Sequence, residues 1–100
     1  MAQLTAAERL NKVKIALYGT AANDFNDEQL TLYIDEIIEE LIDGGVKREV
    51  AESGAAVGCI VVGINDIWNY SSGGVKHSDY FYKRLIQLSK KRGESDVPTE

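Results

Sequence analysis

The segment between Gly54 and Trp68 runs for fifteen residues without a turn signal. Its β-branched residues would suit a buried strand. Its large apolar residues, however, recur at i, i+3, i+4, i+7 and i+11, the period of a helix; they are Val57, Ile60, Val61, Ile64 and Trp68. Because fifteen residues are also long for one strand, the pattern predicts a helix.

Two glycines interrupt this predicted helix. Gly58 and Gly63 each cost roughly 1 kcal/mol relative to alanine in a helix. The expected compensation is the close approach of a neighbouring helix at both positions. Cys59, Val62 and Ile67 lie off the main apolar stripe, so this helix should be covered on more than one side. It is predicted to be the central helix of the fold.

Capping patterns mark two helices before it. Thr5 and Glu8 have the spacing of a capping box and predict a helix over about residues 5–18. Asn26 and Gln29 repeat the pattern at the start of a second helix, which should end at Gly44. The apolar stripe of this second helix is Leu30, Ile34, Ile37 and Leu41. Its acidic residues take the opposite face.

The remaining segments are less regular. Residues 46–53 fit either a helical turn or a lead-in to the central helix. Residues 69–77 are predicted to form a loop, after which Ser78 caps a last helix. The sequence therefore predicts an all-α fold, a compact bundle of about four helices formed by residues 1–92. Residues 93–100 are polar and are expected to form a flexible tail.

Composition excludes several classes of protein. One hundred residues fit a single small domain, and 27% of them are charged. No apolar run approaches the ~18–20 residues that cross a bilayer, so no membrane association is expected. The N-terminal residues lack the pattern of a secretory signal. The single cysteine, Cys59, cannot form an internal disulfide and is expected to be buried. Synthesis in the cytoplasm is expected.

Acidic and basic residues are segregated along the chain. Residues 23–43 contain eight acids and no base, whereas residues 76–92 contain six bases and one acid. Either the two helices pair within one subunit, or the acidic face of one subunit meets the basic face of the next. The sequence leaves both arrangements open.

No catalytic or metal-binding pattern is evident. His77 and the serines near it lack a nucleophile elbow. The neighbouring acids of the second helix lack the Glu-x-x-His pattern of carboxylate metal sites. The glycine-rich spots lack the spacing of a phosphate-binding loop, and an isoelectric point of 4.8 argues against a nucleic-acid patch. We expect no catalytic residue, no metal and no cofactor.

Four segments resemble the small head–tail connector (adaptor) proteins of long-tailed bacteriophages. They are I-N-D-I-W-N-Y-S-S-G-G-V-K at 64–76, F-Y-K-R-L-I-Q-L at 81–88, L-N-K-V-K-I-A-L at 10–17 and D-E-Q-L-T-L-Y-I-D-E-I-I-E-E-L-I at 27–42. The resemblance covers roughly residues 4–90. It lies in the order of the segments, in the tryptophan before the Ser-Ser-Gly-Gly break and in the length, rather than in a chemical signature.

The resemblance implies a non-enzymatic virion protein, made in the host cytoplasm. Copies would form a cyclic ring under the portal protein, extend the DNA channel and dock the head-completion (stopper) or tail protein. DNA would pass through the channel without specific binding.

The candidate interface combines the charged helix faces with two aromatic residues. Its members are Asp35, Glu36, Glu39, Glu40, Trp68, Tyr70, Lys83, Arg84, Lys90, Lys91 and Arg92. The two aromatic residues fit either closure of the core or an interface anchor.

Two alternatives remain. The first is a small helical phage or bacterial regulator that acts by protein–protein binding, which should be a two-fold dimer, whereas a connector should be a monomer or a ring. The second, a helix-turn-helix protein, would need a basic recognition helix. The basic helix here comes last, without a tight turn and partner helix before it.

Overall fold

The computed structural model of the protein describes residues 3–20, 25–71 and 78–91, with the backbone alone for 69–71. Within these residues the fold is all-α, as predicted, and no strand occurs. The elements are α1 (Ala6–Leu17), α2 (Asp27–Asp43), α3 (Arg48–Ala51), the 3₁₀ turn η2 (Gly54–Ala56), α4 (Val57–Ser71) and α5 (Asp79–Ser89). None of the described helices is long and apolar enough to cross a membrane.

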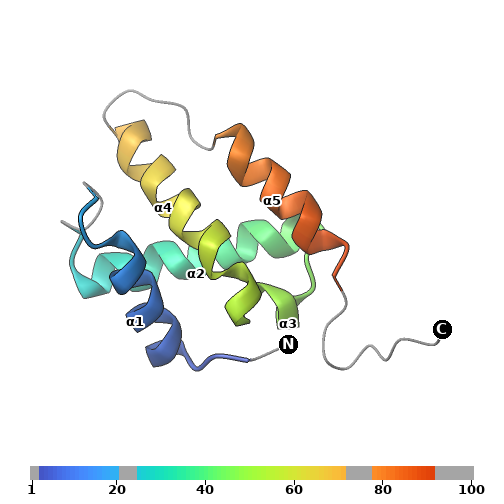
Figure 1. Cartoon of the computed structure of the whole chain (residues 1–100), viewed down its shortest axis with the longest axis horizontal. Coiled ribbons are helices and arrows are strands. Elements are labelled where there is room, and N and C mark those ends of the chain that lie inside the picture. The colour runs from blue at the N-terminus through green and yellow to red at the C-terminus, as the bar shows by residue number, and fades with distance from the viewer. Residues whose placement is uncertain (1–2, 21–24, 72–77, 92–100) are drawn as a thin grey trace.

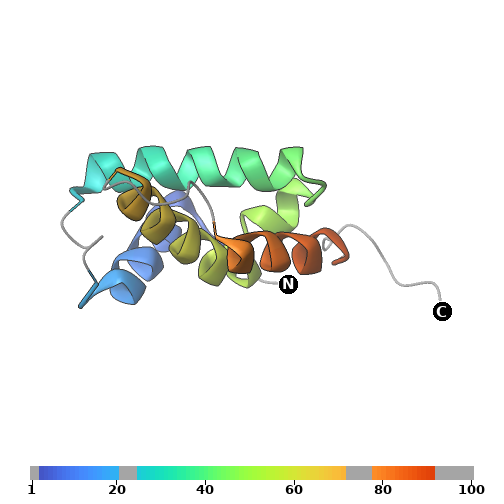
Figure 2. The same cartoon turned by 90° about the horizontal axis from the view of Figure 1, so that it is seen from above.

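The helices form two layers. α4 lies between α1 and α5 in one layer, and α2 crosses behind them (Figure 1). Seen from above, α2 lies along one side of the molecule and α5 along the other (Figure 2). Because α4 packs against α1, α2 and α5, it is the central helix, as its two-sided apolar pattern predicts.

Side-chain caps fix the helix starts at the predicted residues. Thr5 accepts a hydrogen bond from the backbone N–H of Glu8, and the Glu8 carboxylate accepts one from the N–H of Thr5 at 2.8 Å. This second bond lowers the pKa of Glu8. Asn26 and Gln29 form the same reciprocal pair at the start of α2. These caps satisfy backbone donors that a helix leaves free at its start.

The core is built on α4. Ile60 and Ile64 are fully buried, and the predicted stripe of α2 is buried against them. Phe81 and Leu88 contribute the buried face of α5, and Val13 and Leu17 that of α1. The core therefore joins all four long helices around a single apolar segment.

The two glycines of α4 have different environments. A Cβ built on Gly63 would lie 2.8 Å from Ile37 Cδ1 of α2 and 3.0 Å from Phe81 Cε2 of α5. Gly63 is thus the close-packing position that was predicted. A Cβ on Gly58 would meet nothing within 4 Å, so the prediction of close approach is wrong there. Gly58 lies at the exposed side of the first turn of α4, which no helix covers.

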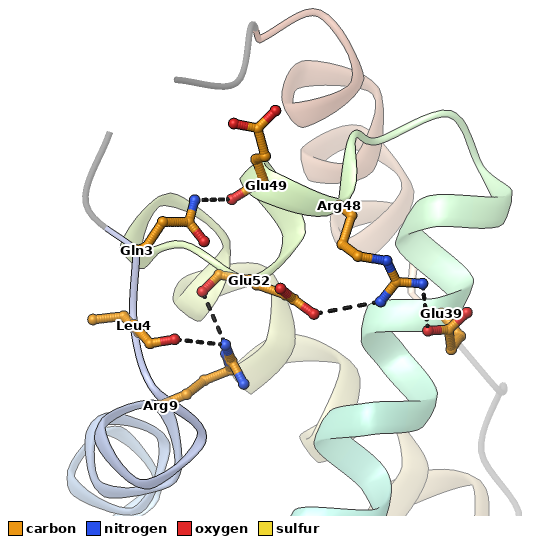
Figure 3. A network of polar contacts seen from close by, with 7 residues as sticks. All are labelled: Gln3, Leu4, Arg9, Glu39, Arg48, Glu49 and Glu52. Carbon is orange, nitrogen blue, oxygen red and sulfur yellow. Dashed lines mark hydrogen bonds and ion pairs between the residues drawn. The ribbon is translucent and has the colours of Figure 1, made fainter. Parts of the chain in front are cut away.

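Residues 46–53 form a helical turn, one of the two structures that their sequence allows. The turn is α3, and η2 then leads into α4. Arg48 ties α3 to α2, because its guanidinium donates to Glu39 at 3.1 Å and to Glu52 at 3.3 Å (Figure 3). All three side chains are substantially exposed, so these ion pairs contribute little stability individually.

The N-terminal arm is fastened to α3 by hydrogen bonds to its backbone. Gln3 Nε2 donates to the carbonyl of Glu49 at 2.7 Å (Figure 3). The buried Arg9 donates through Nη2 to the carbonyls of Leu4, at 2.9 Å, and Glu52, at 3.1 Å. Its Nε is buried without a hydrogen-bond partner in the described part of the chain. The arm and α1 therefore share one attachment to the α3 turn.

Two predictions concern segments that lie partly or wholly outside the described residues. α4 continues to Ser71, so the loop predicted from residue 69 begins too early. Asn69 to Ser71 contain no strong helix breaker, and the glycine pair comes only at 73–74. The tail predicted at 93–100, and with it the domain boundary at residue 92, lies outside the residues that the structure describes.

Candidate protein interface

The outer face of α2 carries a ridge of acidic side chains. Leu30, Ile34 and Ile37 face the core, so residues half a turn away point to solvent. We call these exposed residues the acidic ridge; they are Leu32, Asp35, Glu36, Glu39 and Asp43. Leu32 is 66% exposed although it is apolar. Glu40 lies on the flank of the helix and is only partly exposed.

The acidic ridge places like charges at helical-neighbour spacing. Glu36 and Glu39 are three residues apart, and Glu39 and Asp43 are four apart. Such pairs destabilise a helix by a few tenths of a kcal/mol each. Arg48 forms an ion pair with Glu39. At the start of α2, Asp27 pairs with Lys14 of α1 at 3.0 Å. Two acids of α2 thus pair with bases of α3 and α1.

The outer face of α5 is basic and partly apolar. Phe81 and Leu88 face the core. The exposed residues on the opposite face, which we call the basic ridge, are Tyr82, Lys83, Ile86 and Lys90. Tyr82 is 49% exposed and Ile86 53%. The exposed Asp79 lies on the same face one turn before Lys83, in the first turn of the helix, where a carboxylate suits the helix dipole.

Arg84 does not belong to the basic ridge, although it adjoins Lys83 in the sequence. It is partly buried and donates to Gln87 on α5 and, at 3.5 Å, to the carbonyl of Ala55. It therefore connects α5 to η2, the turn that leads into α4. Lys91 is exposed on the flank of the helix end, and Arg92 lies outside the described residues.

The two ridges point in opposite directions. Ile37 on the inner face of α2 and Phe81 on the inner face of α5 both reach the same backbone position, Gly63. Since the inner faces converge on α4, the outer faces diverge. Figure 2 shows this arrangement, with α2 and α5 along opposite sides of the molecule. The domain thus presents an acidic surface on one side and a basic surface on the other.

Trp68 takes part in an aromatic cluster at the other end of α4. It is partly buried and meets Phe25 edge to face, with ring centroids 5.1 Å apart. Phe25 in turn contacts Tyr33 of α2 at 4.9 Å. These contacts favour the core role for Trp68 over the interface role. The side chain of Tyr70 lies outside the described residues.

An exposed apolar surface on α1 was not predicted from the sequence. Ile15 and Tyr18 are 67% and 83% exposed, and with Asn11 and Lys14 they line an open hollow of about 400 Å³. The signal was available, because Ile15 and Tyr18 fall off the stripe formed by Leu10, Val13 and Leu17. A cluster of exposed large apolar side chains marks a candidate surface for binding another molecule.

The seam between α4 and α5 contains polar groups that serve packing. Asp66 Oδ2 accepts hydrogen bonds from the backbone N–H of Ser78, at 2.8 Å, and from its hydroxyl, at 3.0 Å. The Ser78 hydroxyl oxygen accepts from the N–H of Phe81 and caps α5. Cys59 is buried in the same seam, and burial raises the pKa of its thiol to about 11. The thiol is therefore protonated near neutral pH and is a poor nucleophile.

Among the described residues, no group of three His, Cys, Asp or Glu side chains could hold a metal ion. Comparison of the chain with protein-family models, with curated proteins and with solved structures finds no match.

Proposed function

We propose that the protein is a structural subunit of a bacteriophage head–tail connector. Copies form a ring under the portal, extend the DNA channel and dock the stopper or tail protein. The observation that carries this proposal is the placement of an acidic ridge and a basic ridge on opposite sides of one small domain. A ring requires each subunit to present two different, mutually complementary surfaces. The sequence resemblance over residues 4–90 supports the assignment to the connector.

DNA passes through this ring without specific binding. The net charge of −5 and the acidic isoelectric point oppose a strong hold on the phosphate backbone. Affinity for nucleic acid depends mainly on cationic contacts to phosphates. A channel formed by an acidic protein would therefore let the genome move during packaging and ejection.

A two-fold regulator is the second candidate, and the surface of α1 favours it. A two-fold contact uses the same patch on both copies. Ile15 and Tyr18 form such an exposed apolar patch beside an open hollow. Replacing Tyr18 by Glu would place two carboxylates in that contact and abolish a dimer of this kind, while leaving a head-to-tail ring intact.

Disruption of the gene in the phage genome that carries it tests the connector proposal. The expected result is filled or partly filled heads and separate, complete tails, because the two cannot be joined. A matched control with a silent substitution in the same codon should give normal particles, and the gene supplied in trans should restore them. Electron microscopy of the lysate is the measurement.

Normal tailed particles after disruption of the gene would overturn the connector assignment. If the purified protein is in addition a tight two-fold dimer that Tyr18→Glu dissociates, the regulator is the correct assignment. Light scattering across a concentration series measures this second property. For a connector we expect a monomer that assembles only at high protein concentration or on its portal.

A further inference from the structure

We propose that the partner of the acidic ridge is the basic ridge of a second copy of this chain, in a head-to-tail contact of α2 on α5. This inference rests on the proposed function, because it specifies the contact between neighbouring subunits of the ring. It follows from the charge, spacing and position of the two ridges, all of which lie within the described residues.

The charges on the two ridges have matching intervals. Glu36 and Asp43 are seven residues apart on α2, and Lys83 and Lys90 are seven residues apart on α5. Seven residues are two helical turns, so each pair spans about 10.5 Å along one face. Two helices laid side by side can therefore form both ion pairs at once. Opposite charges at a common spacing fix the register of a contact and exclude wrong partners.

Exposed apolar side chains accompany these charges. Ile86 and Tyr82 flank Lys83 on the basic ridge, and Leu32 lies one turn before Glu36 on the acidic ridge. Each exposes about half of its surface or more to water in the single subunit. Burial of these side chains between two copies would add a hydrophobic contribution to the binding free energy. Such a contribution is needed because exposed ion pairs alone bind only weakly.

The positions of the ridges exclude a closed two-fold dimer through these surfaces. A contact of α2 on α2, or of α5 on α5, would oppose like charges. A reciprocal dimer, with α2 on α5 twice, would need both ridges on the same side of the subunit, whereas they lie on opposite sides. The remaining arrangement is a head-to-tail contact that repeats from one copy to the next. Such a contact forms a closed ring or an open filament.

Two complementary double variants test this contact. The variant K83E/K90E places glutamates at the two paired positions of the basic ridge, and the variant E36K/D43K places lysines at the two paired positions of the acidic ridge. Each variant alone should assemble poorly, because like charges then meet at both pairs. An equal mixture of the two should assemble again, with the variants alternating, since every contact in the mixture regains opposite charges. A control variant, K12E/K47E, carries the same change in net charge as K83E/K90E, at exposed positions that belong to neither ridge.

Sedimentation velocity from about 1 μM to about 1 mM protein at low ionic strength, where screening is weak, is the measurement. We expect wild type and K12E/K47E to assemble over the same range. Each ridge variant should need at least about tenfold more protein for half-assembly, a shift equivalent to about 1.4 kcal/mol. Melting temperatures should remain close to that of the wild type, because the ridges are exposed.

The proposal is overturned if the wild type stays monomeric throughout this range, if the ridge variants assemble as well as the wild type, or if the mixture fails to assemble. A connector whose copies bind the portal one at a time would pass the gene-disruption test and fail this one. The two proposals can therefore fail separately.

Discussion

The inner faces of α2 and α5 converge on Gly63, where Ile37 and Phe81 leave no space for a Cβ atom. The outer faces of the same two helices carry exposed charges and half-exposed apolar side chains. One face of each helix is thus committed to the subunit, while the other remains available to a second copy. Substitutions on the inner faces should therefore change stability, and substitutions on the outer faces should change assembly.

The largest effect is expected at Gly63. Gly63→Leu forces a branched side chain against Ile37 and Phe81, and such overpacking costs about 1–3 kcal/mol in free energy of unfolding. Gly58→Ala is the matched control, because the added methyl meets open space and gains helix propensity of up to about 1 kcal/mol. Urea denaturation of both variants measures the difference. Equal stability of the two would mean that α2 and α5 do not meet at Gly63.

A smaller effect is expected from the thiol in the α4–α5 seam. Burial raises the pKa of Cys59 from 9.0 to about 11. Between these values the unfolded chain loses the proton and the folded chain keeps it, so stability falls as pH rises from about 9 to about 11. The loss is on the order of 2 kcal/mol. Because tyrosines and lysines titrate in the same range, the measurement is the difference in unfolding free energy between wild type and Cys59→Ala.

The difference between these two proteins should shrink as pH increases through this interval, since the variant lacks the group that titrates. A constant difference would show that the thiol is accessible to water in the folded protein. The seam between α4 and α5 would then be looser than the burial of Cys59 indicates.

The smallest effect is expected on the outer face of α2. Glu36→Lys replaces repulsion by attraction toward Glu39 and Glu40, and should raise the stability of the monomer by a few tenths of a kcal/mol. Glu36→Gln should give part of this gain. Urea denaturation below the assembly concentration is the measurement. A loss of 1 kcal/mol or more would mean that Glu36 supports the subunit itself and is not free for a second copy.

Local features of the sequence predicted the helices better than they predicted the surfaces. The caps at Thr5 and Asn26 depend on residues three positions apart, so the chain itself specifies them. Gly58 and Gly63 look alike in the sequence, and only the presence of side chains from α2 and α5 beside Gly63 distinguishes them. The single turn of α3 depends on tertiary contacts to Glu39 and the N-terminal arm, which explains why its sequence was ambiguous.

The sequence indicated which helices carry the charged residues of the candidate interface, but not where those residues lie relative to one another in the fold. Charge segregation identified the acidic and basic helices, and helical periodicity indicated which acids face outward. Lys83 and Arg84 are neighbours in the sequence, but the partial burial of Arg84 removes it from the basic ridge. That the two ridges lie on opposite sides follows from the packing of both helices on α4, which no local pattern encodes.

The most direct test of the head-to-tail contact is cross-linking through cysteines placed on the two ridges. The variant E36C/I86C has one exposed thiol on each ridge, while Cys59 stays buried and protonated. With a short thiol-to-thiol cross-linker, we expect a ladder of dimers, trimers and larger products, because each copy links to two neighbours. Each single-cysteine variant should remain monomeric. Efficient dimers from I86C or E36C alone, or no product from the double variant, would rule out the head-to-tail contact.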